Sequence, residues 1–180
     1  MERKDCFGEL VRDRYSCRGY RPDPVPEEMI AYCLEAVRLA PSACNRQPWR
    51  LAVVQEPGLR RALCERGVLP GLSMTWMRQA PVLVALALER SLLTHVAAPW
   101  LSKVDYSLVD GGIAGEHFVL AAAAQGLGSC WIGWIDGKAV RRLLHWPRSY
   151  KVIALFTLGF PADAPKEKIR QPLDKFVRRA

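Results

Sequence analysis

Residues 106–125, with the sequence YSLVDGGIAGEHFVLAAAAQ, form a long helical pattern that decides how the rest of the chain can fold. Between positions 113 and 124 the stretch is apolar nearly all round and is broken by Glu116 and His117. A helix of this kind is buried on most of its sides. Gly126 is placed to cap the C-terminus of this helix. We therefore expect a central helix that other elements cover.

Three glycines, Gly111, Gly112 and Gly115, lie inside this predicted helix. Each lowers helix stability by roughly 1 kcal/mol relative to alanine. The close approach of another helix would compensate for that loss, and we expect such an approach here. The helix is also too hydrophobic for the surface of a monomer, which favours a dimer that does not separate into folded subunits.

Shorter patterns on both sides of this helix predict one central sheet covered by helices. Apolar runs predict strands at residues 51–54, 82–88, 130–132 and 152–158. Further helices are expected within the first 21 residues, from Pro26-Glu27-Glu28 to Pro41-Ser42, and over residues 59–66 and 138–144. Strands separated by helices give a three-layer arrangement. No repeat or linker divides the chain, so residues 1–180 are expected to form a single domain.

The composition excludes several classes of protein. The 180 residues are 50% hydrophobic and 24% charged, which is typical of a globular domain rather than a disordered chain. The longest clean apolar run, 82–88, is far shorter than the roughly 20 residues of a membrane span. The charged N-terminus leads into no apolar stretch, so no signal peptide is expected. We expect a cytoplasmic protein with six free cysteines and, because the cysteines and histidines lack ligand spacing, no metal site.

The formal net charge of +8 favours an anionic partner such as nucleic acid, an acidic lipid or a phosphorylated small molecule. One group of basic residues lies near the N-terminus, at Arg12, Arg14, Arg18 and Arg21. A second group lies near the C-terminus, at Lys166, Lys168, Arg170, Lys175, Arg178 and Arg179. Two solvated basic faces are the alternative interpretation. A nucleic-acid-binding domain without a cofactor is another, although no such motif is present and the tryptophans are not interleaved with the basic residues.

The common catalytic motifs are absent from the chain. It contains no G-x-S-x-G, no H-E-x-x-H, no phosphate-binding P-loop and no G-x-G-x-x-G that follows a strand. His117 lies beside Glu116, but adjacent residues on a helix do not face each other. The sequence therefore indicates no acid–base pair.

Arg14, Ser16 and Arg18 alternate in the segment RYSCR. In an extended segment alternate side chains share a face. Two guanidinium forks and a hydroxyl on one face suit a phosphate group. A solvated basic turn is the alternative interpretation.

Two further segments suit a flat ligand. In residues 40–49, APSACNRQPW, Asn45 and Gln47 can each donate and accept hydrogen bonds, which suits the edge of a heterocycle. The alternative is a turn in which asparagine and serine cap the backbone. In residues 126–133, GLGSCWIG, glycines allow the backbone to approach a ring closely. The alternative there is a tight turn that enters a core strand.

These segments, taken together and in this order, resemble the FMN-dependent nitroreductase family. Arg14, Ser16 and Arg18 match the family motif R-x-S-x-R, residues 24–28 match P-V-P-x-E, and residues 40–49 match A-P-S-A-x-N-x-Q-P-W. Asp110, Gly112 and Ala114 match Asp-x-Gly-x-Ala, and residues 126–133 match G-L-G-x-x-W-I-G. The end of the family pattern is matched by residues 158–161, Lys168 and Arg170. The matches span nearly the whole chain.

The resemblance implies an α+β fold of three layers, with a central mixed sheet, that works as an obligate homodimer with FMN at its interface. It implies a phosphate site formed by Arg14, Ser16, Arg18, Lys168 and Arg170. The isoalloxazine ring would face Pro41, Ser42, Ala43 and Asn45, supplied by the other subunit. The other side of the ring would face the backbone of Cys130, Trp131, Ile132 and Gly133.

The resemblance also implies an enzyme that takes electrons from NADH or NADPH and reduces a nitroaromatic, a quinone or a similar oxidant by a ping-pong mechanism. FMN supplies the chemistry, so no catalytic side chain is expected. A specialised flavin enzyme of the same fold, active in dehalogenation, enone reduction or flavin fragmentation, is the alternative. Residues 91–103 match no family pattern. We expect His95 and Trp100 there to contact the substrate, and ordinary packing of both residues is the alternative. Tyr15 replaces an arginine found in many members and is expected to face away from the phosphate.

Overall fold

The computed structural model of the protein describes residues 2–89 and 104–179. Its elements follow the chain as α1 (Arg3–Asp13), α2 (Glu27–Arg38), η1 (Ala43–Asn45), β1 (Trp49–Val54), α3 (Pro57–Arg66), η2 (Thr75–Gln79), β2 (Val82–Glu89), α5 (Tyr106–Ala124), β3 (Gly128–Ile132), α6 (Gly137–Leu143), β4 (Tyr150–Gly159) and η3 (Leu173–Lys175). Each strand and helix expected from the sequence is present, with small differences at the ends. The predictions for residues 91–103, with His95 and Trp100, lie outside the described residues.

The strands form one sheet in the order β1-β2-β4-β3, and every pair of neighbours in it is antiparallel. A parallel contact is present beside β3, where Ser16 forms an isolated bridge with Ser129. The α+β class is therefore confirmed. The prediction of a mixed sheet is wrong for the described residues, because all the strands of the sheet pair in the antiparallel sense and the parallel bridge of Ser16 is isolated.

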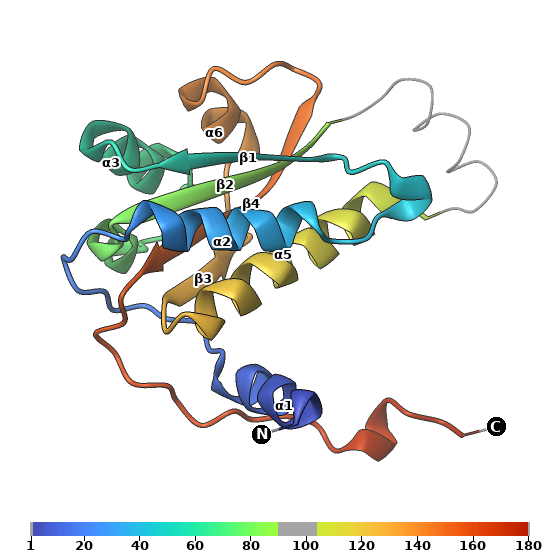
Figure 1. The fold of residues 1–180 in the computed structure, drawn as a ribbon. Helices are drawn as coiled ribbons and strands as arrows, with labels where there is room; N and C mark the ends of the chain where they lie inside the picture. The colour runs from blue at the N-terminus through green and yellow to red at the C-terminus, as the bar shows by residue number, and fades with distance from the viewer. Residues whose placement is uncertain (1, 90–103, 180) are drawn as a thin grey trace.

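Strand β2 shows why the fold has three layers. Val82, Val84 and Leu86 pack into a core shared with α2 and α5, whereas Leu83 and Ala85 pack into a second core with α3 and α6. Because successive side chains of a strand point to opposite faces, an uninterrupted apolar strand is buried on both faces. Figure 1 shows α2 and α5 over one face of the sheet and α3 and α6 on the other side.

Helix α5 is the buried central helix expected from residues 106–125. Phe118 and Ala122 on this helix are fully buried in the core beneath α2. The helix ends at Gly126, which has φ +74°. The backbone N–H of Gly126 donates to Ala123 and that of Leu127 to Ala122, so two carbonyls at the end of the helix are satisfied. The predicted glycine cap is confirmed.

The expected contact of another helix with the glycines of α5 is wrong for two of the three. A Cβ atom at Gly111 would lie 2.6 Å from Cδ1 of Ile153, and one at Gly115 would lie 2.1 Å from Cζ3 of Trp131. Both neighbours belong to strands, so these glycines let α5 approach the sheet. At Gly112 an added Cβ would meet no atom of the described residues within 4 Å.

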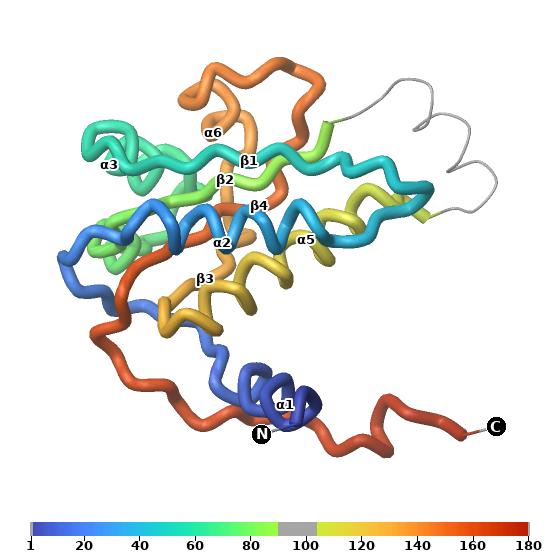
Figure 2. The backbone as a smooth tube through the Cα atoms, viewed as in Figure 1, coloured from blue at the N-terminus to red at the C-terminus, as the bar shows by residue number. Residues whose placement is uncertain are grey.

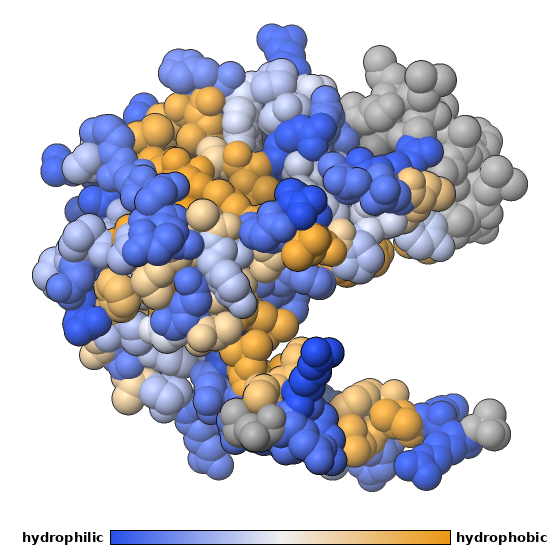
Figure 3. Space-filling model, viewed as in Figure 1, coloured by the Kyte–Doolittle hydropathy of each residue, from blue (hydrophilic) through white to orange (hydrophobic). Residues whose placement is uncertain are grey.

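Helix α1 and the C-terminal arm, residues 162–179, lie outside the three layers (Figure 2). The arm passes α1, where Lys168 Nζ donates to the carbonyls of Val11 and Arg12. Figure 3 shows apolar surface inside the hollow between the body of the molecule and this outer part. In the described residues, no helix combines the length and apolar character needed to cross a bilayer.

Candidate functional site

The segment that carries Arg14, Ser16 and Arg18 runs extended along the beginning of β3. It leaves α1 at Arg14, and the N–H of Cys17 donates to the carbonyl of Ser129 at 3.0 Å. Cys17 is fully buried, whereas Ser16 and Arg18 on either side of it are exposed. This alternation places the side chains of positions 14, 16 and 18 on the outer face, as the spacing predicts.

Asp163 lies beneath this segment and binds its inner face. The hydroxyl of Tyr15 and the thiol of Cys17 each donate to Asp163 Oδ1 at 3.0 Å, and the N–H of Arg18 donates to Oδ2 at 2.8 Å. Tyr15 therefore points to Asp163 and away from the arginine face. Burial acts to raise the pKa of Asp163, but the hydrogen bonds from Arg18, Cys17 and Tyr15 outweigh it and hold this pKa below its usual value.

The C-terminal arm brings two more cationic side chains to the same place. Lys168 Nζ donates to the carbonyls of Val11 and Arg12, which places this ammonium at the end of α1, two residues before Arg14. Burial and the positive charges of Arg14 and Arg170 lower the pKa of Lys168. Arg14 and Arg18 also act on the pKa of Cys130, which burial raises overall and a hydrogen bond from Ser16 lowers. Arg14 and Arg18 from the first basic group, and Lys168 and Arg170 from the second, thus lie near one another and near the beginning of β3.

We call Arg14, Ser16, Arg18, Lys168 and Arg170 the basic cluster. Its donors are guanidinium forks, one ammonium and one hydroxyl on an exposed surface. This set of donors is suited to the oxygens of a phosphate monoester, which carries enough negative charge to relieve the repulsion among the cations. The residues present therefore fit the phosphate end of FMN.

The side chains of β3 are occupied in packing, so a ligand beside this strand would contact its backbone. The ring of Trp131 packs edge-on against Phe156, with the centroids 4.7 Å apart, and covers Gly115 on α5. Cys130 and Ile132 are buried. An added Cβ at Gly133 would meet no atom within 4 Å in the part of the chain that the structure describes. Backbone contact with a ring is the role that the resemblance implies for residues 130–133.

The turn 41–47 is a separate, strained part of the candidate site. Cys44, Asn45 and Gln47 have φ of 52°, 53° and 49°, a left-handed conformation that side chains other than glycine rarely adopt. Such residues gather at ligand sites, where the surrounding structure holds them in place.

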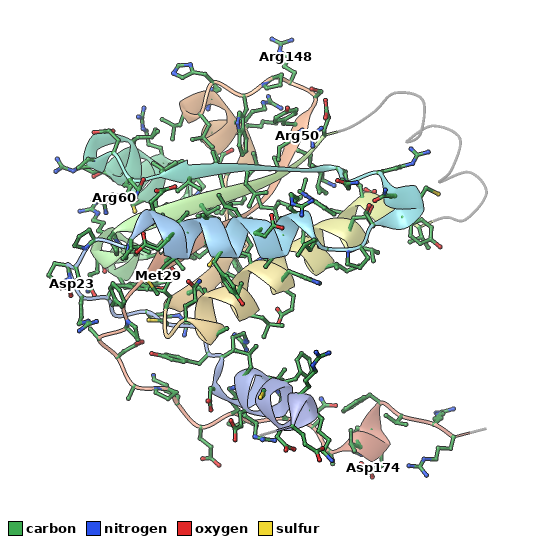
Figure 4. All side chains as sticks on the ribbon, in the orientation of Figure 1. Asp23, Met29, Arg50, Arg60, Arg148 and Asp174 are labelled. Atoms are coloured by element: carbon green, nitrogen blue, oxygen red, sulfur yellow. The ribbon has the colours of Figure 1, made fainter. Side chains whose placement is uncertain are left out.

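Hydrogen bonds fix this turn to the elements around it. The N–H of Ala43 donates to Asp110 Oδ1 on α5 at 2.9 Å, and the N–H of Gln47 donates to Ser42 Oγ at 2.9 Å. Arg50, labelled in Figure 4, donates to the carbonyl of Gln47 at 3.2 Å from β1. Ser42 therefore caps the turn, as the alternative interpretation expected, while Pro41, Ala43 and Asn45 are held at its tip.

The structure does not bring the turn 41–47 and the basic cluster together within one chain. The turn is bound to Asp110 near the beginning of α5, whereas the basic cluster lies beside β3, which follows the end of α5 after Gln125. At 1.5 Å per residue, these two points of the helix are about 22 Å apart. Figure 1 shows η1 and α1 at separate places. A single FMN can contact both only if the two parts come from different subunits.

Sequence reasoning missed Asp163 and the packing of Trp131. Asp163 lies in a proline-containing stretch of mixed charge, PADAPKEK, where no pattern separates it from any solvated acid. Trp131 lies in a recognised motif, but the pattern does not show that its ring fills the space left by Gly115. Both roles depend on contacts between segments far apart in the sequence.

We expect the Cys17 thiol to resist alkylation. Burial and the hydrogen bond to Asp163 raise its pKa to about 11, so the reactive thiolate is scarce at pH 8. Peptide mapping after treatment with iodoacetamide should show slow modification of Cys17 in the native protein and rapid modification in denaturant. Equal rates in the two states would contradict the buried thiol.

Comparisons with known proteins agree with this architecture. The family model described as "Nitroreductase family" matches residues 11–69 and 68–160. An NADH dehydrogenase of Thermus thermophilus is 33% identical over 196 residues, with 91% of each chain covered. An iodotyrosine deiodinase of Thermotoga neapolitana is 28% identical over 181 residues, with 89% of this chain and 90% of that one covered.

Solved structures give the same result for the fold. An FMN-dependent nitroreductase of Clostridium difficile superposes with a TM-score of 0.76 at 24% identity, covering 94% of this chain and 96% of that one. A likeness at this identity supports the fold, while the family model and the relative at 33% identity establish the family. The chain therefore belongs to the nitroreductase family, which confirms both the resemblance and the oxidoreductase class that it implies.

Proposed function

We propose that this protein is an FMN-dependent oxidoreductase that takes electrons from NADH or NADPH and reduces small oxidants such as nitroaromatics or quinones. The observation that carries the proposal is the basic cluster, in which cations from both ends of the chain meet beside an open backbone edge. The names of related proteins support it, because one is an NADH dehydrogenase and another an FMN-dependent nitroreductase.

In this proposal each part of the chain has one task. The basic cluster binds the phosphate of FMN, and the backbone of residues 130–133 lies along one side of the ring. Pro41, Ser42, Ala43 and Asn45 of the other subunit face the ring in the homodimer. FMN, when bound, supplies the hydride chemistry, and the protein orients it and excludes water.

The surface of the chain supports the homodimer. A groove of about 530 Å³ lies between α1, α2 and α5, and its walls include Phe7, Tyr32 and Ile113. Phe7 is 61% exposed, and Phe176 on the C-terminal arm is 66% exposed. Apolar surface of this extent marks an interaction site on a protein of this size. A second copy of the chain would cover it and would also bring a turn 41–47 to each basic cluster.

Dehalogenation is the second candidate function, because the relative from Thermotoga neapolitana is an iodotyrosine deiodinase. The flavin site would be the same, and the oxidant would be an iodinated phenol. Anaerobic reduction of the purified, yellow protein with NADH or NADPH, followed by a panel of oxidants, separates the two functions. Faster turnover of the iodinated phenol than of nitroaromatics and quinones would favour the second. A colourless protein that binds nucleic acid would overturn both.

We expect ping-pong kinetics for the oxidoreductase. The chain contains no dinucleotide fingerprint that would hold a nicotinamide cofactor at a place of its own, so the reductant and the oxidant must use one space over the ring in turn. Initial rates at varied concentrations of both substrates should give parallel double-reciprocal lines. Intersecting lines would require a ternary complex and would contradict the shared space.

A further inference from the structure

Asp163 places a negative charge beside the basic cluster, which is proposed to bind a negatively charged phosphate. It lies 2.8 Å from the backbone N–H of Arg18, one of the residues of the basic cluster, and its pKa is held below the usual value, so it is ionised at neutral pH. A negative charge beside a site for a phosphate dianion opposes binding. A carboxylate at this position therefore calls for a reason other than the electrostatics of the ligand.

The hydrogen bonds of Asp163 supply that reason. Its two carboxylate oxygens accept from Tyr15, Cys17 and Arg18, three residues of one extended segment. We propose that Asp163 is a positioning residue that holds this segment extended, so that Arg14, Ser16 and Arg18 share one face and FMN is preferred to riboflavin. The inference rests on the proposed function and adds a residue that determines its phosphate specificity.

Two other hydrogen bonds hold the backbone of Cys17 in place, but they do not hold Arg18. The N–H of Cys17 is bound by Ser129, and the hydroxyl of Tyr20 donates to the carbonyl of Cys17 at 2.8 Å. Neither bond reaches the N–H of Arg18. Without the Asp163 carboxylate, the N–H of Arg18 loses its acceptor and the segment can twist to find another. Tyr15 and Cys17 each lose one of two acceptors: the hydroxyl of Tyr15 keeps the main-chain carbonyl of residue 163 at 2.9 Å, and the thiol of Cys17 keeps the carbonyl of Gly19 at 3.1 Å.

A positioning role and a purely electrostatic role of Asp163 predict opposite changes in FMN affinity when the residue is replaced. Loss of the negative charge alone would strengthen the binding of an anion beside it. Loss of the hydrogen bonds would instead misalign the phosphate donors and weaken FMN binding. Riboflavin has the same ring and no phosphate, so its affinity should hardly depend on Asp163 if the residue acts through the basic cluster.

The test is to titrate apoprotein carrying D163A or D163N with FMN and with riboflavin, following flavin fluorescence. For D163A we expect the Kd of FMN to rise at least about tenfold, as expected for the loss of bonds to a charged group. The Kd of riboflavin should change by less than about threefold, within the scatter expected of a site that is not involved. In D163N the amide retains one oxygen that can accept a hydrogen bond, so this variant should lose less FMN affinity than D163A. It also provides the measurement if D163A does not fold.

Asp136 provides a matched control. Its carboxylate accepts from the N–H groups of Lys138 and Ala139, both at 3.0 Å, at the beginning of α6 and away from the basic cluster. D136A should lower the thermal stability and leave the ratio of the two dissociation constants unchanged.

Each other outcome has a distinct meaning. Tighter FMN binding by D163A, or an equal loss for FMN and riboflavin, would overturn the positioning role and leave the proposed function standing. Wild-type protein that does not prefer FMN to riboflavin would overturn the phosphate site itself, and with it the proposed function of the basic cluster.

Discussion

Replacing Arg14 and Arg170 together by alanine is expected to weaken FMN binding by roughly one hundred to ten thousandfold, because each charge-assisted bond to the phosphate contributes about 1.5–3 kcal/mol. The two residues come from opposite ends of the chain. The hydrogen bonds of Lys168 to Val11 and Arg12 bring the arm that carries Arg170 to the end of α1, and both arginines act to lower the pKa of Lys168. Titration of the apoprotein with FMN measures the effect. Each single variant should lose about ten- to a hundredfold.

The control for this experiment removes the same number of charges elsewhere. Arg61 on α3 and Arg142 on α6 are exposed and lie on the opposite side of the sheet from α5. The double variant R61A/R142A should bind FMN almost as the wild type does, because exposed charges at a distance are screened by salt. An equal loss in both double variants would mean that net charge, rather than the basic cluster, attracts the ligand.

The secondary structure could be predicted because its signals are local. The apolar run of β2 and the glycine cap of α5 are decided by residues next to one another in the sequence, and both predictions are confirmed. The alternation of Arg14, Ser16 and Arg18 is local in the same sense. A period of two residues is enough to place these side chains on one face once the segment is extended.

The parts that could not be predicted depend on contacts between distant segments. The apolar pattern shows that α5 is buried, but it does not show which side of the helix meets a strand, so Gly115 was assigned to a helix contact when it meets Trp131. Asp163 carries no local signal, because its role exists only after the arm passes beneath residues 15–18. The turn 41–47 and the basic cluster lie near opposite ends of α5, and no local pattern shows that the two parts are separated in one chain.

Two of the three glycines of α5, Gly112 and Gly115, are expected to respond differently to substitution by leucine. Gly112 lies one turn from Val109 and Glu116, on the exposed side of the helix, and an added Cβ there meets nothing among the described residues within 4 Å. In the proposed dimer this side faces the other subunit. We expect Gly112→Leu to stabilise the helix itself by up to about 1 kcal/mol, because leucine has a higher helix propensity than glycine, and to disrupt dimer assembly and FMN binding together.

Gly115→Leu should lose FMN binding for a different reason, because it destabilises the fold of the chain itself. Its Cβ would lie 2.1 Å from Cζ3 of Trp131 and 3.1 Å from Cζ of Phe156, inside the packing between α5 and the sheet. Forcing added carbon atoms into a filled core destabilises the fold by about 3 kcal/mol or more at such a contact. Circular dichroism during urea denaturation should therefore separate the variants, with Gly112→Leu retaining a cooperative transition and Gly115→Leu unfolding early. Sedimentation together with flavin absorbance completes the test, because a Gly112→Leu protein that remains dimeric with full FMN occupancy would contradict an interface on this side of α5.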